Sequence, residues 1–278
     1  MKYTLIGDSI CDLHARNFCT ARVDFHVVPL TMYVGDQEFV DSDELDTAML
    51  MQKIDETKAC PKTACPSPEA FYEIMAKGDN IVVITVSSKL SATHSAASQA
   101  AERITREQPN KKVFVLDSRT AAAGCDYLLI QARDLMDAGT PFDELTTRIT
   151  QIRDKMRTRF LVHDLSSLVK NGRMSKMAGK MLSTIKLKVI GGDDGEGEIK
   201  KHGVAIGTKR ALVAISQMPV TDKHPQDGLI VIAHNHNIED MGFLKGLLEK
   251  FGFNNIKTFL TRGASSIYTA EKGVVIAY

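Results

Sequence analysis

Residues 81–93 read Ile-Val-Val-Ile-Thr-Val-Ser-Ser-Lys-Leu-Ser-Ala-Thr: a short apolar run, then a turn of small polar residues, then the start of a helical stretch that continues through Ala101. An apolar run of this length, rich in β-branched residues, predicts a buried strand. Similar runs at Tyr3–Ile6 and Val113–Leu116 are also followed by helix-like stretches. Strands that alternate with helices predict βαβ units and a parallel sheet, with ligands at the carboxyl ends of the strands. We therefore predict an α/β protein whose first half contains a mostly parallel sheet.

Further apolar runs in the second half of the chain predict a second α/β lobe. A helical pattern extends from Pro141 to Arg157, and we place the boundary between a first lobe, residues 1–157, and a second lobe, residues 158–278, at its end. Within residues 27–41 we expect a hairpin whose turn is Gly35-Asp36. The ligand is expected between or within the lobes. The second lobe should contain a Gly/Asp loop at Gly191–Gly197 and strands at Phe160–Val162, Leu229–Ala233, Lys257–Leu260 and Val274–Ala277.

The composition excludes several classes of protein. The chain of 278 residues is 44% hydrophobic and 25% charged, as in a globular protein, and its net charge of +1 gives no strong field for nucleic acid or an anionic membrane. Its five cysteines form no C-x-x-C pair, and we expect them to be reduced thiols of a cytoplasmic protein. The N-terminal apolar stretch is too short for a signal peptide, and no stretch approaches the length of a membrane span.

Two polar turns are candidate binding sites. In the turn quoted above, Ser91 is the expected N-cap of the following helix, where a hydroxyl and unpaired backbone N–H groups favour an anion such as a carboxylate. Ser88 and Thr93 belong to the same turn. Thr63 lies in an expected loop just before Ser67-Pro68, a well-formed helix start. Each hydroxyl also has a plain structural interpretation, in which Ser91 only caps its own helix and Thr63 only bonds to backbone.

Other classes of function have weaker support. Gly7-Asp8-Ser9 resembles the nucleophile block of GDS-type serine hydrolases, but none of the eight histidines has an aspartate three residues earlier, so Ser9 has no evident activator. A phosphotransfer protein would need a nucleophilic histidine beside a strand end, for which His94 and His234 are the candidates. No metal site is indicated, since the acidic stretch Asp36–Glu44 lacks the spacing of a calcium loop.

A series of short motifs extends over nearly the whole chain. The motifs are Asp8-Ser9 with Asp12-Leu13, Val28-Pro29-Leu30 with Asp41, Thr63–Pro68, Ser87–Thr93, Asp117-Ser118, Leu168–Ser175, Ile185-Lys186 and Ile276–Tyr278. In this order they are similar to the sequence blocks of the DegV family. One such motif would be a weak signal, whereas the ordered series is specific. On these residues the chain resembles a DegV family fatty-acid-binding protein.

The resemblance implies a two-lobed DegV-like fold that binds a long-chain fatty acid, without a cofactor, a metal or a catalytic residue of its own. Hydroxyls at the positions of Thr63 and Ser91 hold the carboxylate in that family. To these we add Ser88, Thr93 and Tyr268 from the matching blocks as expected binding residues. Members of the family present the fatty acid to a separate fatty acid kinase, which forms the acyl phosphate for phospholipid metabolism. A lipid-binding protein with a sensing or structural role and no kinase partner is the alternative.

The chain departs from the family pattern at four positions. The family arginine falls on Ile206 and the family histidine on Tyr268, while Ala64 and Leu187 replace a serine and a proline. A tyrosine can donate one hydrogen bond but carries no positive charge near neutral pH. We therefore expect weaker carboxylate binding, and the hand-over to a kinase is in question.

Overall fold

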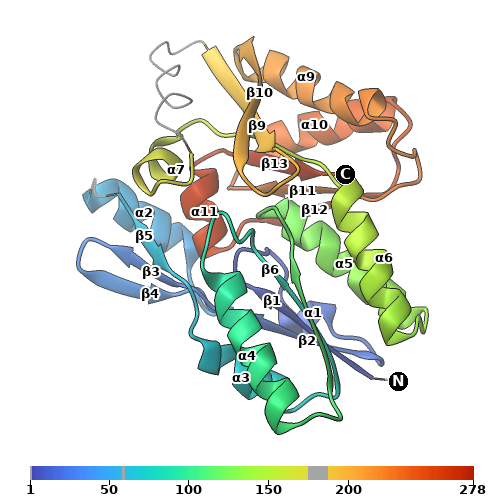
Figure 1. Ribbon diagram of the computed structural model, residues 1–278. Helices are drawn as coiled ribbons and strands as arrows, with labels where there is room; N and C mark the ends of the chain where they lie inside the picture. The colour runs from blue at the N-terminus through green and yellow to red at the C-terminus, as the bar shows by residue number, and fades with distance from the viewer. Residues whose placement is uncertain (1, 58–59, 175–186) are drawn as a thin grey trace.

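Four parallel strands form the first sheet of the protein, which we describe from a computed structural model that covers residues 2–57, 60–174 and 187–278 (Figure 1). The strand order is β2-β1-β6-β7. The strands span Tyr3–Asp8 (β1), Val23–Val28 (β2), Asn80–Thr85 (β6) and Lys112–Asp117 (β7). All three pairings in this sheet are parallel, which confirms the prediction of a parallel sheet in the first half.

Helices cover both faces of this sheet. Successive residues of a strand point to opposite faces, and both faces of the central strands are apolar. Ile6 and Val83 pack in a core with α3 (Pro68–Met75) and α4 (Thr93–Glu107). Leu5 and Val82 belong instead to the larger core that includes residues of α5 (Ala123–Asp137) and α6 (Phe142–Lys155). The helix expected at Pro141–Arg157 is thereby confirmed to within two residues at each end.

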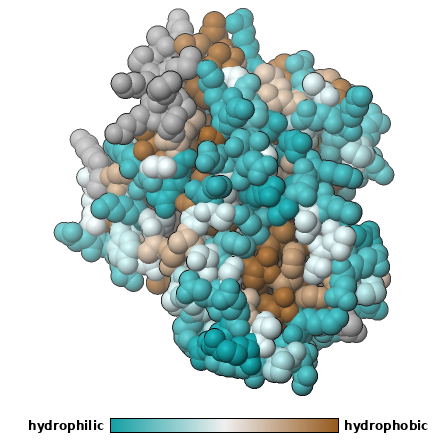
Figure 2. Space-filling model, viewed as in Figure 1, coloured by the Kyte–Doolittle hydropathy of each residue, from teal (hydrophilic) through white to brown (hydrophobic). Residues whose placement is uncertain are grey.

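The outer edge of the first sheet is only partly covered. Figure 2 shows an apolar area bordered by hydrophilic residues in the region that Figure 1 places between α4 and α6, where residues 113–115 of the edge strand β7 are half-buried. Lys112 pairs with Asp143 at one end of the strand, and Arg153 donates a hydrogen bond to the carbonyl of Asp117 at the other end. These charged contacts protect the edge against pairing with another strand.

A hairpin forms a small separate sheet with the order β4-β3-β5. β3 (Thr31–Val34) and β4 (Gln37–Val40) are joined at Gly35-Asp36, as expected, and β5 (Lys62–Ala64) pairs with β3. The expected start of the hairpin at residue 27 is wrong, because residues 27 and 28 end β2 and pair in parallel with β1. The helix α2 (Thr47–Thr57) contacts β3, whereas α1 (Ala15–Phe18) contacts β2 of the first sheet.

The second sheet has six strands in the order β10-β9-β8-β13-β11-β12, and only the β11–β12 pair is parallel among the pairings that the structure describes. The helices α9 (Thr208–Thr221) and α10 (Ile238–Lys250) pack on one face of this sheet, whereas α7 (Ser166–Lys170) and α11 (Gly263–Thr269) lie toward the first lobe (Figure 1). The strands span Thr158–Leu161 (β8), Leu187–Asp193 (β9), Ile199–Ile206 (β10), Ile230–His234 (β11), Ile256–Leu260 (β12) and Val274–Ala277 (β13).

One expected loop in the second lobe is in fact largely a strand. Gly191, Gly192 and Asp193 belong to β9, and only residues 194–198 form the turn to β10. Glycine is usually depleted in strands, but here Gly191 pairs with Phe160 of β8 and leaves room for its ring. A cross-strand aromatic side chain compensates for the missing side chain of the glycine.

Buried carboxylates join α11 to the first lobe. The backbone N–H of Arg262 donates to Asp12 Oδ1 (2.8 Å), and those of Gly263 and Ala264 donate to the carboxylate of Asp41 (3.0 and 2.8 Å). The Arg262 guanidinium also donates to Asp43 Oδ1 (2.6 Å). The first N–H groups of a helix have no partners within the helix, so these carboxylates fix the start of α11 against the first lobe.

A further carboxyl group, carried by α5, contacts this joint. The backbone N–H of Asp12 donates to Asp126 Oδ1 (2.7 Å), and both side chains are fully buried. Burial is the main cause that raises the pKa of Asp12 to about 7 and the pKa of Asp126 well above its usual value. The Asp12 and Asp126 side chains also hydrogen-bond to each other, and two buried carboxyl groups in contact share a proton more readily than they both ionise.

Replacement of Asp126 by asparagine tests the buried carboxyl pair. The folded state raises the pKa of Asp126, so it holds a proton that the unfolded chain releases above about pH 4. The contribution of Asp126 to the free energy of unfolding is therefore full at low pH and is lost as the pH rises from about 4 toward the folded-state pKa. Asp126→Asn cannot ionise, so its free energy of unfolding should improve relative to wild type by up to about 1.4 kcal/mol per pH unit over this range. Urea unfolding at pH 5, 6 and 7 measures the difference.

The exposed Asp55→Asn variant is the matched control and should show no such trend. The comparison must be a difference between variants, because burial lowers the pKa of His163, His202, His224 and His234, and these groups act in the opposite direction in the same pH range. A constant difference between Asp126→Asn and wild type from pH 5 to 7 would contradict a shared proton at this joint.

Candidate binding cavity between the lobes

An apolar cavity lies between the turn after β6 and the second sheet. It contains about 870 Å³ of space free of protein atoms, part of which is open to solvent. Its walls include apolar side chains from both lobes, namely Ile10, Leu30, Val86, Leu90, Ala121, Ala122, Phe160, Val162, Leu168 and Val275.

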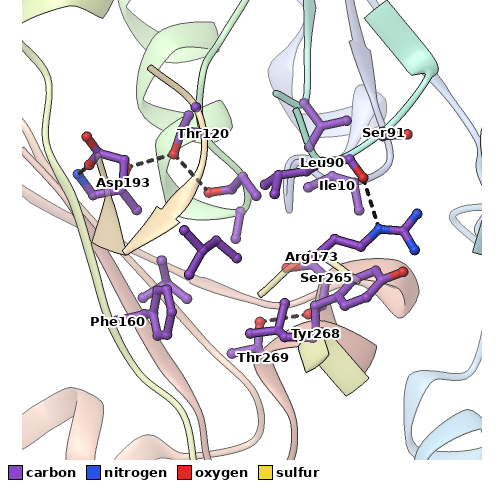
Figure 3. A pocket seen from close by; sticks show the side chains of 18 of the residues that line it. Ile10, Leu90, Ser91, Thr120, Phe160, Arg173, Asp193, Ser265, Tyr268 and Thr269 are labelled. Atoms are coloured by element: carbon purple, nitrogen blue, oxygen red, sulfur yellow. Dashed lines mark hydrogen bonds between the residues drawn. The ribbon is translucent and has the colours of Figure 1, made fainter. Parts of the chain in front are cut away.

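Polar side chains gather at one side of the cavity. Thr63 Oγ1 and Tyr268 OH are hydrogen-bonded at 2.8 Å, although 205 residues separate them in the sequence. Ser91 lies on the same lining and its Oγ is 2.9 Å from Thr93 Oγ1. Figure 3 shows Ser91, Arg173 and Tyr268 together on this side and Phe160, Thr120 and Asp193 on the other. The cavity is therefore apolar in the middle and has a cluster of hydroxyl groups at one side, which we call the hydroxyl cluster (Thr63, Ser91 and Tyr268).

The structure brings together three of the five expected binding residues. Thr63, Ser91 and Tyr268 line the cavity. Thr93 is buried behind Ser91 and contacts it through the 2.9 Å hydrogen bond. Ser88 is exposed, its backbone N–H donates to Asp117 Oδ1, and its side chain is not on the cavity lining.

Two details of the expected local structure are wrong. Ser91 is not the N-cap of α4, because that position is Ala92, and the Ser91 hydroxyl instead accepts a hydrogen bond from the Thr93 N–H (3.3 Å). Thr63 is in strand β5, opposite Met32, and not in a loop. The helix start at Ser67 is confirmed, since its Oγ accepts a hydrogen bond from the Ala70 N–H.

Arg173 is a cavity residue that the sequence did not assign to the site. In the turn Asn171-Gly172-Arg173, Gly172 has a φ of +75° and Arg173 is half-buried. Arg173 Nε donates to the carbonyl of Leu90 (3.0 Å) and Nη1 donates to the carbonyl of Asn171 (2.7 Å). The guanidinium carbon lies 5.9 Å from the centre of the Tyr268 ring. These contacts place a fixed positive charge beside the hydroxyl cluster.

Ile206, the residue that falls on the family arginine in the resemblance, lies away from the cavity. Its side chain is 57% exposed at the end of β10 and does not line the cavity. The neighbouring motif residues Ser175, Ile185 and Lys186 lie outside the residues that the structure describes.

The candidate residues of a serine hydrolase or a phosphotransfer protein are not arranged for either reaction. Ser9 is completely buried, its Oγ accepts a hydrogen bond from the Leu30 N–H (2.9 Å), and its hydroxyl bonds to Asp41. No hydrogen bond from a histidine to Ser9 is present among the described residues. His94 and His234 are outside the cavity lining, and His234 Nδ1 accepts a hydrogen bond from the Asn237 N–H. In the three described stretches of the chain, no three potential metal ligands converge.

The fold and this cavity define a class: a two-lobed α/β protein that encloses an apolar ligand site with a polar group of hydroxyls at one side. The chain belongs to the DegV family, because the family model described as "Uncharacterised protein, DegV family" matches residues 2–278. A DegV domain-containing protein of Streptococcus gordonii is 31% identical over 279 residues, covering 100% of this chain and 99% of the relative. Among the described residues, no helix is both long enough and apolar enough to cross a membrane.

Solved structures of two further relatives have the same fold. The Fak B3 protein of Streptococcus pneumoniae, a Fatty Acid Kinase protein loaded with linoleic acid, is 31% identical with a TM-score of 0.94 over 100% of this chain and 99% of that chain. A DegV family protein of Eubacterium eligens, loaded with heptadecanoic acid, is 25% identical with a TM-score of 0.92 over 99% of this chain and 98% of that chain. The expectations of a DegV-like sequence and fold are thus confirmed.

The hydrogen bond between Thr63 and Tyr268 joins the two lobes, and its coupling energy can be measured without a ligand. Thr63→Val and Tyr268→Phe each remove one hydroxyl and keep the shape of the side chain. Because the two hydroxyls bond to each other, we expect a coupling energy of about 0.5–1.5 kcal/mol in the double-mutant cycle. Urea unfolding of the four proteins measures it, and strictly additive effects would show that the hydroxyls do not interact.

Proposed function

We propose that this protein binds a long-chain fatty acid, with the acyl chain in the cavity and the carboxylate at Thr63 and Ser91. The observation that carries the proposal is the hydroxyl cluster, with Arg173 beside it, at one side of a mostly apolar cavity. The fatty acids bound by the relatives from Streptococcus pneumoniae and Eubacterium eligens support this ligand class. The protein itself supplies no catalytic residue in this proposal, and it needs no cofactor or metal.

The apolar walls account for the affinity. Burial of about fourteen methylene groups at roughly 0.8 kcal/mol each sets a ceiling near 11 kcal/mol, before the loss of motional freedom of the ligand. A buried carboxylate without hydrogen bonds would cost several kcal/mol. The ligand therefore needs apolar walls along its chain and hydrogen-bond donors at its head, as the two sides of this cavity provide.

The hydroxyl cluster has enough protons for a carboxylate. Thr63 and Tyr268 carry one hydroxyl proton each, and their mutual hydrogen bond uses only one of the two. Thr93 can donate to Ser91, which leaves the Ser91 proton free for the ligand. Two hydroxyl donors thus remain for the two carboxylate oxygens, and Arg173 supplies a positive charge nearby. In this arrangement Thr93 orients Ser91 and does not itself contact the carboxylate. Ser88 has no role in the head-group site.

We place the protein in the cytoplasm, where it presents the fatty acid to a separate fatty acid kinase. The name of the Streptococcus pneumoniae relative, a Fatty Acid Kinase B3 protein, supports the partner, and five free cysteines are in keeping with a reducing compartment. We retain the two lobes of residues 1–157 and 158–278 as the unit that encloses the ligand, since the first sheet ends at Asp117 and the second begins at Thr158.

Tyr268 replaces the family histidine within the cavity, whereas the exposed Ile206 replaces the family arginine outside it.

Removal of two hydroxyls tests the head-group site. The double variant Thr63→Val with Ser91→Ala should bind palmitate about 2–4 kcal/mol more weakly than wild type, because the carboxylate loses both donors. Displacement of a fluorescent fatty acid measures the affinity. Ser88→Ala is the matched control and should bind as wild type does, since its side chain is outside the cavity. Equal affinities of the double variant and the control would place the carboxylate elsewhere.

A further inference from the structure

Alternate residues of β8 form one wall of the cavity. Thr158, Phe160 and Val162 all line it, as expected for residues that point to the same face of a strand, and Val162 directly follows the end of β8. Phe160 stands between Val275 of β13 and Gly191 of β9 in the register of the sheet. On one side the ring therefore has a branched side chain as its neighbour, and on the other it has bare backbone.

The ring of Phe160 lies over the bare backbone of Gly191. A Cβ atom added to Gly191 would come closer than 3.0 Å to three atoms of that ring. The ring can take this position only because residue 191 has no side chain. With the sheet on one side of it, a displaced ring must move toward the cavity, since the phenyl group is only 7% exposed and already lines that space.

The neighbouring wall is fixed more firmly. Thr120 and Thr158 line the cavity beside Phe160, and their hydroxyls are hydrogen-bonded at 2.7 Å. Both hydroxyls also lie close to Gly124 of α5, where a Cβ atom would collide with them. The packing against α5 and the hydrogen bond hold these two side chains, so the position of the Phe160 ring decides how much space remains at this side.

Figure 3 shows Phe160 on the side of the cavity opposite Ser91 and Arg173. An acyl chain whose carboxylate is at the hydroxyl cluster therefore extends toward Phe160. We infer that Phe160, laid against Gly191, is the residue that sets the length of the acyl chain that this protein accepts. The inference rests on the proposed fatty acid binding and adds the specificity of the site.

Two variants change the available length in opposite directions. Gly191→Ala pushes the ring into the cavity and favours shorter acids, whereas Phe160→Leu removes the ring and favours longer acids. Gly203→Ala is the control, because it adds a methyl group to the adjacent strand β10 with only an ordinary contact of 3.7 Å to Ile190. Each protein is incubated with an equimolar mixture of saturated C12 to C20 fatty acids, and native mass spectrometry measures the bound acids.

We expect the bound fraction of C18 relative to C14 to fall in Gly191→Ala by about fourfold for each methylene that no longer fits. In Phe160→Leu the C20 acid should gain relative to C16, and Gly203→Ala should match wild type. Thermal unfolding checks that each variant is folded, and Phe160→Leu carries the test if Gly191→Ala does not fold.

Two results would overturn the inference while the proposed function stands: unchanged chain-length profiles in both variants, or shifts of both in the same direction. A wild-type protein that takes up no fatty acid from the mixture would overturn the proposed function, and this inference with it.

Discussion

The start of α11 is held by two buried carboxylates of the first lobe, and the binding cavity depends on this contact. Asp12 and Asp41 accept hydrogen bonds from the first backbone N–H groups of the helix, and Arg262 bonds to Asp43 in the same joint. Because α11 carries Ser265, Tyr268 and Thr269 to the cavity lining, the same joint brings Tyr268 within hydrogen-bond distance of Thr63. Removal of one partner from such a buried charged network is costly, so the lobes and the site are stabilised together.

The cavity separates affinity from orientation. Its apolar walls come from the cores of both lobes and have no preferred direction for a ligand, whereas the hydroxyl cluster and Arg173 occupy one side only. In the proposed binding mode, a ligand with a polar head and a long apolar chain lies with its head at the hydroxyl cluster. Tyr268, which falls on the family histidine in the resemblance, offers a neutral donor. The positive charge beside the hydroxyl cluster is that of Arg173, which donates to the carbonyls of Leu90 and Asn171.

Much of the fold could be predicted from the sequence, because buried strands are visible as apolar runs. The strands that were missed have a different composition: Val23–Val28 includes Asp24 and His26, and the outer strand Ile199–Ile206 has two lysines and a histidine directly after its first residue. Gly191 was assigned to a loop because the compensating ring of Phe160 comes from a partner strand about thirty residues away, which no local pattern reveals. Local motifs together with the resemblance led us to Thr63 and Ser91, and both line the cavity. The position of Arg173 could not be found in this way, since it depends on the carbonyl of Leu90, 83 residues away in the sequence.

In the proposed complex, one long-chain fatty acid lies in the cavity with its carboxylate at the hydroxyl cluster. A crystal structure of the protein with palmitate tests it most directly. We expect carboxylate oxygens within hydrogen-bond distance of Ser91 and Thr63 and an acyl chain that runs between the lobes to the ring of Phe160. Electron density that places the carboxylate away from these hydroxyls, or a cavity filled by protein side chains with the lipid bound elsewhere, would contradict it.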